Sequence, residues 1–194
     1  VHAFANSRAG VSDVIQVQEL TPEGTQVTRN RKIVFNGYEK HPTLEGPKFY
    51  KRNGYYYIFA PGGGVAQGWL VVLRSKDPFG PYEDRIVLAQ GKTDINGPHQ
   101  GGYVELDNGE GWFVHFQEKQ PYGRIVHLQP VKWVNDWPVM GIDEDGDEVR
   151  HLGHAEAEAA RSGDERDQAD RVRPVHPVAG RRARGWKQNA SRFV

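Results

Sequence analysis

The sequence contains no cysteine. This excludes disulfide frameworks, thiolate metal sites and cysteine nucleophiles, and it fits an oxidising and a reducing compartment equally well. The formal net charge is zero, so no long-range field attracts nucleic acid or an anionic membrane. No apolar run approaches the ~18 residues of a transmembrane helix, and no secretory signal pattern is present. We expect a soluble protein without nucleic-acid or membrane partners, and the compartment stays open between cytoplasm, periplasm and secretion.

Residues that form strands and turns are abundant instead. The chain holds 5 Trp, 8 Tyr and 8 Phe together with 23 Gly and 12 Pro. Ring-rich segments between frequent turn residues are typical of all-β proteins. The chain also opens directly on Val1-His2-Ala3-Phe4-Ala5, which has the pattern of a buried strand. We therefore expect an all-β fragment whose upstream partner strand lies outside these residues.

An aromatic strand pattern recurs three times, about 55 residues apart, in residues 1–5, 55–60 and 112–117. Each copy is followed by a glycine-containing turn and a second strand, and the first two copies continue into a further apolar segment. These following segments cover residues 14–20, 68–75 and 123–128, then 32–35 and 86–88. The second and third copies also have a preceding strand, at 48–51 and 102–106, joined to the aromatic strand through Asn-Gly, a strong hairpin signal.

Four short antiparallel strands that repeat at this period are the pattern of a β-propeller blade. The repeats account for about three blades, whereas closed propellers typically have about 4–8. The pattern therefore predicts an incomplete propeller, because these blades cannot close a ring. A β-sandwich with accidental internal similarity is the alternative that periodicity leaves open.

The composition changes near Arg150. Residues 151–194 hold 8 Ala and 8 Arg, and strand alternation disappears there. We divide the chain into a partial propeller domain, residues 1–149, and an anomalous Ala- and Arg-rich tail, residues 150–194. The tail is either a disordered or weakly helical segment or a non-native sequence produced by a reading-frame error.

A compact polar motif with glycine precedes two of the repeats. The motifs are His-Pro-Thr-Leu-Glu-Gly-Pro-Lys at 41–48 and Thr-Asp-Ile-Asn-Gly-Pro-His-Gln-Gly-Gly at 93–102. The innermost strand of each propeller blade lines the central channel, and one end of that channel is the usual binding site. Glu45 and His99 enter such strands at equivalent positions, so the repeat predicts that both point towards a shared axis.

Three segments, in this order, resemble family 43 glycoside hydrolases, which are five-bladed β-propellers. Glu45-Gly46-Pro47 is similar to the general-acid motif of the family. Residues 97–101, Gly-Pro-His-Gln-Gly, resemble its central histidine segment, and residues 123–133 resemble its arginine-containing segment. The resemblance runs nearly continuously from Val1 to about Asp145 and is closest to β-xylosidase and α-L-arabinofuranosidase members. It implies O-glycosidic bond hydrolysis with inversion, on pentose-containing plant polysaccharide such as xylan or its xylo- and arabino-oligosaccharides.

The resemblance also implies roles for individual residues. Glu45 is the expected general acid, and an acid that works near neutral pH needs a pKa raised by burial or by a neighbouring carboxylate. His99 is the expected contact of a calcium ion or an ordered water at the channel centre, with no organic cofactor. Arg124 is expected to hydrogen-bond the sugar, since its planar fork suits paired hydroxyls. Further candidate substrate-binding residues are Arg8, Phe59, Trp69 and Gln100.

The chain departs from the family in one respect that bears on activity. Inversion needs a second carboxylate that activates water. By the resemblance, the general-base Asp and the Asp that adjusts the pKa of the acid belong to segments upstream of the part that matches Val1. Asp94 is the nearest channel candidate, but it does not match the base motif. We therefore expect a glycosidase chain that lacks its general base. A non-catalytic sugar-binding propeller and a protein-interaction propeller are the competing hypotheses.

Overall fold

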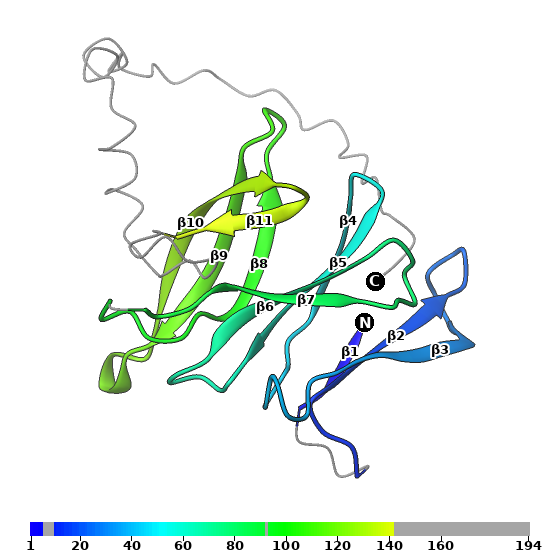
Figure 1. Cartoon of the computed structure of the whole chain (residues 1–194), viewed down its shortest axis with the longest axis horizontal. Helices are drawn as coiled ribbons and strands as arrows, with labels where there is room; N and C mark the ends of the chain where they lie inside the picture. The colour runs from blue at the N-terminus through cyan, green and yellow to red at the C-terminus, as the bar shows by residue number, and fades with distance from the viewer. Residues whose placement is uncertain (6–9, 92, 142–194) are drawn as a thin grey trace, which may run out of the picture.

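The computed structural model describes residues 1–5, 10–91 and 93–141. These residues form three antiparallel sheets that follow one another along the chain (Figure 1). The described ranges include a single 3-10 turn, Gln120–Tyr122. Arg8 and the expected tail, residues 150–194, lie outside the described part of the chain.

No helix within the described ranges is long and apolar enough to cross a membrane.

The first sheet has the order β1-β2-β3, with β1 at His2–Phe4, β2 at Val14–Leu20 and β3 at Val27–Asn36. The second is a four-stranded meander of β4 (Lys48–Arg52), β5 (Tyr55–Gly62), β6 (Trp69–Ser75) and β7 (Glu83–Leu88). The third has the same sequential order, with β8 (His99–Glu105), β9 (Gly111–Glu118), β10 (Arg124–Val134) and β11 (Trp137–Met140). The all-β expectation and the blade-like repeat are confirmed.

Most hairpin turns and strand ends lie where the sequence pattern predicts them. Asn53 and Gly54 both have positive φ, 49° and 74°, as a type I′ turn between β4 and β5 requires. The later Asn-Gly pair sits in a longer loop, in which Leu106 donates its backbone N–H to the Glu110 carbonyl at 2.9 Å. Strand β11 was not predicted, because Pro138 interrupts the strand pattern. Proline is tolerated there because β11 is the edge strand of its sheet.

The middle sheet is buried on both faces, which explains its long apolar runs. In β5, Tyr57 and Phe59 point to the core shared with the third sheet, whereas Ile58 and Ala60 point to the core shared with the first. Successive side chains of a strand alternate between faces, so one strand serves two cores. The three sheets are therefore packed face to face as successive blades.

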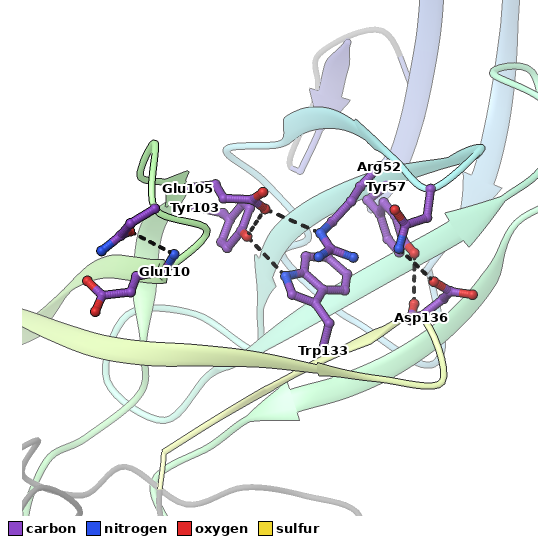
Figure 2. A network of polar contacts seen from close by, with 9 residues as sticks. Arg52, Tyr57, Tyr103, Glu105, Glu110, Trp133 and Asp136 are labelled. Carbon is purple, nitrogen blue, oxygen red and sulfur yellow. Dashed lines mark hydrogen bonds and ion pairs between the residues drawn. The ribbon is translucent and has the colours of Figure 1, made fainter.

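Polar contacts at the periphery join the second sheet to the third (Figure 2). Tyr57 donates its hydroxyl to the Asp136 carbonyl at 2.8 Å. The Tyr103 hydroxyl donates to Glu105 at 2.6 Å and accepts from Trp133 Nε1 at 3.0 Å, while Arg52 Nε lies 3.3 Å from the same Glu105 carboxylate. Tyr57 is also buried, which raises its pKa to about 12 and keeps its hydroxyl protonated as a donor. These bonds fix the angle between the two sheets.

A buried histidine makes the stability of the fold depend on pH. His115 of β9 is 1% exposed and stacks on His127 of β10, with ring centroids 5.4 Å apart. Burial, with a smaller contribution from His127, lowers the pKa of His115 to about 4 from its ordinary 6.5. The unfolded chain therefore binds more protons than the folded chain between pH 6.5 and 4, and stability falls as pH falls through that window. Between pH 7 and pH 5 the expected loss is about 2 kcal/mol.

Urea unfolding at pH 7 and pH 5 measures this loss. We expect His115→Phe, which keeps an aromatic ring but cannot take up a proton, to show a smaller decrease than the parent chain. His2→Gln is the control, because His2 is exposed and its loss leaves the buried ring in place. Equal decreases in the parent and in His115→Phe would contradict the assignment.

Candidate active site

The loop between β3 and β4 carries Glu45, and its main chain is held at several points. The buried Asp13 accepts a hydrogen bond at Oδ1 from the Thr43 backbone N–H at 2.5 Å. Glu45 donates its own backbone N–H to the Pro61 carbonyl at 3.0 Å, and Gly63 donates to Pro42 at 2.6 Å. The loop is thus tied to the first sheet on one side and to the end of β5 on the other. This places Glu45 at the entrance of β4, as the repeat predicts.

His41 holds the same loop in place through two side-chain hydrogen bonds. Its ring is 1% exposed, and Nδ1 accepts a hydrogen bond from Trp69 Nε1 at 3.1 Å. The proton of a neutral ring must then sit on Nε2, which donates to Asp84 at 2.8 Å. Burial alone would raise the pKa of Asp84, but hydrogen bonds from His41 and Lys40 outweigh it and hold that pKa below its usual value. Asp84 therefore stays ionised and keeps the loop fastened to β7.

Glu45 and His99 meet directly. Glu45 Oε1 lies 2.5 Å from His99 Nε2. The His99 side chain is only 2% exposed, whereas the Glu45 side chain is 36% exposed. The imidazole nitrogen can donate to a carboxylate or accept from a carboxylic acid. The contact therefore fixes the orientation of a carboxyl that solvent, and hence a substrate, can reach.

Phe116 and Arg124 extend this arrangement along the third sheet. The Phe116 ring stands edge-on to His99, with centroids 5.5 Å apart, and the Arg124 guanidinium lies over its face at 4.6 Å. Arg124 Nε also approaches Glu118 Oε2 at 3.5 Å, and its side chain is 61% exposed. A continuous series of side-chain contacts thus links Glu45, His99, Phe116 and Arg124. Phe116 was missed from the sequence, although it matches Phe59 in the aromatic repeat.

Gln100 lies over the Glu45 motif. Its side-chain amide packs against Gly46, so closely that a Cβ at Gly46 would overlap it. Gly46 has φ +50° and Gln100 φ +48°, both in the left-handed region. Gln100 is exposed, so its amide is available beside Glu45. The structure therefore brings Gln100 to the same site as Glu45, His99 and Arg124.

The two remaining aromatic candidates lie elsewhere. Phe59 is 1% exposed and packs in the core against Tyr50, Tyr103 and Phe113. A ring enclosed on all sides has no face for a sugar, so Phe59 as a substrate-binding residue is wrong. Trp69 is half-buried, donates to His41, and presses its ring edge against Gly63. In the described residues it supports the Glu45 loop, and sugar stacking on Trp69 stays a prediction.

Among the described residues, no group of three or more His, Asp or Glu side chains is arranged to hold a metal ion. His99 Nε2 is engaged by Glu45, and the buried Nδ1 has no hydrogen-bond partner in the described part of the chain. Calcium prefers a shell of six to eight oxygen ligands. The described residues around His99 do not supply such a shell.

The profile of the glycosyl hydrolases family 43 matches residues 3–138. The chain belongs to glycosyl hydrolase family 43. Its three sheets are blades of the five-bladed β-propeller of that family, of which these residues form an incomplete part.

Individual family 43 proteins support this assignment. A putative beta-xylosidase of Xylanibacter ruminicola is 49% identical over 142 residues, which cover 73% of this chain and 26% of that protein. A non-reducing end alpha-L-arabinofuranosidase of Bacteroides ovatus is 35% identical over 139 residues, covering 64% and 26%. The crystal structure of the family 43 protein BlXynB of Bacillus licheniformis superposes with a TM-score of 0.59 at 30% identity, covering 67% and 28%. The chain thus spans about a quarter of the length of these relatives.

Proposed function

We propose that this chain is the acid-bearing part of an inverting glycoside hydrolase. Its substrate would be pentose-containing plant polysaccharide or the xylo- and arabino-oligosaccharides derived from it. Glu45 would protonate the glycosidic oxygen, and Arg124 and Gln100 would hydrogen-bond the sugar. His99 would hold the Glu45 carboxyl in place. The water-activating carboxylate of the reaction would come from outside the residues described above.

The observation that carries the proposal is the Glu45–His99 contact at 2.5 Å, made between a half-exposed carboxyl and a buried ring. An acid catalyst must be reachable by substrate and yet held in one orientation, and this pair meets both needs. Arg124 adds an exposed, planar hydrogen-bond donor at the end of the same series of side chains. The names of the Xylanibacter and Bacteroides relatives favour xylosides and arabinofuranosides as the substrates to test.

A calcium ion at the propeller centre, which the family resemblance implies, would have one protein contact among the described residues, His99. Its remaining ligands would be water or residues outside the described part of the chain. Elemental analysis of the purified chain after dialysis, beside His99→Ala, tests this separately from catalysis.

The function is tested with aryl β-xyloside and aryl α-arabinofuranoside. Both are offered to the full chain and to a chimera in which residues 3–138 replace the matching segment of the Xylanibacter relative, which supplies the remainder of the propeller. We expect hydrolysis by the chimera, and proton NMR of the first product formed should show the inverted anomer.

Two outcomes would count against this proposal. A chimera that unfolds cooperatively but cleaves neither glycoside, while the parent relative is active under the same conditions, would contradict it. A chimera that binds xylose without any turnover would favour the non-catalytic sugar-binding alternative.

A further inference from the structure

The loop between β5 and β6, residues 63–68, lies between the two motifs of the candidate active site. It contacts the loop that carries Glu45 and also the segment 94–97, which leads into His99. Glu45 precedes a strand of the second sheet, and His99 opens a strand of the third. The contact between their side chains therefore depends on how far apart the β5–β6 loop holds the two motifs.

The β5–β6 loop is joined to the Glu45 motif through the main chain. Gly63 donates its N–H to the Pro42 carbonyl at 2.6 Å, and Glu45 donates its own N–H to the carbonyl of Pro61, near the end of β5, at 3.0 Å. Both bonds are made by backbone atoms, which cannot turn aside as a flexible side chain can. A displacement of the loop is therefore passed on to Glu45.

Two glycines in backbone contact join the loop to the His99 segment. A Cβ at Gly97 would lie 2.6 Å from the backbone nitrogen of Gly68 and 2.9 Å from its carbonyl oxygen. Gly97 is buried, and neither glycine has a positive φ, so glycine is required here for the close approach of the two backbones. No side chain fits between the two segments, and the backbones themselves set the spacing.

Asn96 strengthens the same contact with its side chain. It donates Nδ2 to the Ala66 carbonyl of the loop at 3.1 Å, and its buried Oδ1 has no hydrogen-bond partner among the described residues. From the other direction, Gln117 of β9 donates Nε2 to the Asp94 carbonyl at 3.0 Å, and Ile95 is buried in the core between the second and third sheets. The segment 94–97 is thus held between the third sheet and the β5–β6 loop.

The tolerance of this arrangement is small. Ordinary contacts of a Cβ begin at 3.4 Å, so a Cβ at Gly97 must push the two backbones apart by about 1 Å. A displacement of that size at His99 would lengthen its 2.5 Å contact with Glu45 to about 3.5 Å, the limit of a hydrogen bond. A misplacement of about 1 Å can lower a catalysed rate by about 10²-fold.

We propose that the β5–β6 loop sets the separation of Glu45 and His99, and that Asn96 is a positioning residue, which acts through His99 on the orientation of the Glu45 carboxyl. The contact between the two side chains is independent of any reaction. Its effect on turnover rests on the proposed function, in which Glu45 donates the proton.

NMR of the full chain with isotope-labelled histidine measures the contact directly. An Nε2–H of His99 that donates to the Glu45 carboxylate and is shielded from solvent should give a downfield proton signal that exchanges slowly with water. Glu45→Ala should remove this signal and so identifies it. A parent chain without such a signal would overturn the inference, because there would be no contact to position.

Two variants test the loop, each with a matched control. Asn96→Asp replaces the N–H donor with an oxygen that repels the Ala66 carbonyl, and Gly97→Ala forces the two backbones apart. We expect both variants to move the His99 signal upfield and to speed its exchange. Asn108→Asp, at an exposed loop position, and Gly102→Ala, where a Cβ has room, should leave the signal unchanged.

Kinetics in the chimera separate positioning from a general loss of structure. Asn96→Asp should lower kcat on methyl xyloside, whose leaving group needs a proton, by about tenfold to 10²-fold. KM, and the rate on a dinitrophenyl xyloside, which leaves without protonation, should stay close to those of the parent. Equal losses on both glycosides would show that Asn96 supports the fold rather than the acid.

An unchanged His99 signal in folded Asn96→Asp and Gly97→Ala chains would overturn the inference. Should Gly97→Ala fail to melt cooperatively, Asn96→Asp decides alone, because it keeps the size of the side chain. A chimera that cleaves no glycoside, while the His99 signal still depends on Asn96, would reject the proposed function and leave the role of the loop intact.

Discussion

Glu45→Gln is expected to lower the hydrolysis of substrates with poor leaving groups by about 10²–10⁴-fold. A general acid matters most when the departing oxygen needs a proton, as in xylobiose or a methyl xyloside. A dinitrophenyl xyloside leaves without protonation, so the same variant should retain most of its activity on it. The amide of glutamine keeps the size of the side chain and a hydrogen bond to His99 but cannot deliver a proton.

The measurement is kcat/KM on the two substrate classes in the chimera described above. Glu110→Gln serves as the control, because Glu110 is an exposed glutamate of the loop between β8 and β9 and undergoes the same chemical change. Equal losses on dinitrophenyl and methyl xylosides would show that Glu45 acts in a step other than proton donation. No loss on either would remove Glu45 from the mechanism.

Gly101→Ala is expected to destabilise the fold by about 3 kcal/mol or more. Gly101 is buried in β8 directly over the Phe113 ring, and a Cβ there would overlap it, with Cε1 and Cε2 at 2.6 and 2.7 Å. Phe113 is 0% exposed and belongs to the core between the second and third sheets, so it has no room to withdraw. Either β8 or the core ring must move.

The adjacent glycine offers a matched control. A Cβ at Gly102 would lie 3.8 Å from the Tyr50 hydroxyl, an ordinary contact, so Gly102→Ala should change stability little. We expect Gly101→Ala to lower the melting temperature by about 10 °C and Gly102→Ala by far less. A movement of β8 would also displace His99, so the Gly101 variant should lose sugar binding before it unfolds. Comparable melting temperatures for the two variants would show that the overlap is relieved without cost.

Much of the fold could be predicted because the signals are local. The Asn53-Gly54 turn specifies a tight hairpin through its own backbone preference. The aromatic repeat marks the second strand of the second and third sheets. Glu45 lies just before β4 and His99 is the first residue of β8, and this equivalent placement predicts that they converge. The structure brings the two together, with 2.5 Å between Oε1 and Nε2. Strand β11 could not be predicted in this way, because Pro138 interrupts its pattern of strand-forming residues.

The sequence repeat does not predict the surroundings of a side chain, as Phe59 and Phe116 show. They occupy the same position in residues 55–60 and 112–117, so the repeat treats them alike. The structure covers Phe59 with Tyr103 and Phe113 of the third sheet, whereas Phe116 lies beneath Arg124 and beside His99. The difference comes from the neighbouring sheet, and no local pattern records which sheet packs on which face.

The sequence by itself determined the all-β class, the blade repeat, the family and the motif that contains Glu45, because each depends on residues that are close along the chain. Only the tertiary structure decided what holds that motif: Asp13, which directly precedes β2 of the first sheet, and His41, which is bonded to Asp84 and Trp69 of the second. It also decided that the β5–β6 loop lies between that motif and the segment that leads into His99. These contacts join residues that are far apart in sequence. Such residues become neighbours only when the sheets pack together and bury them.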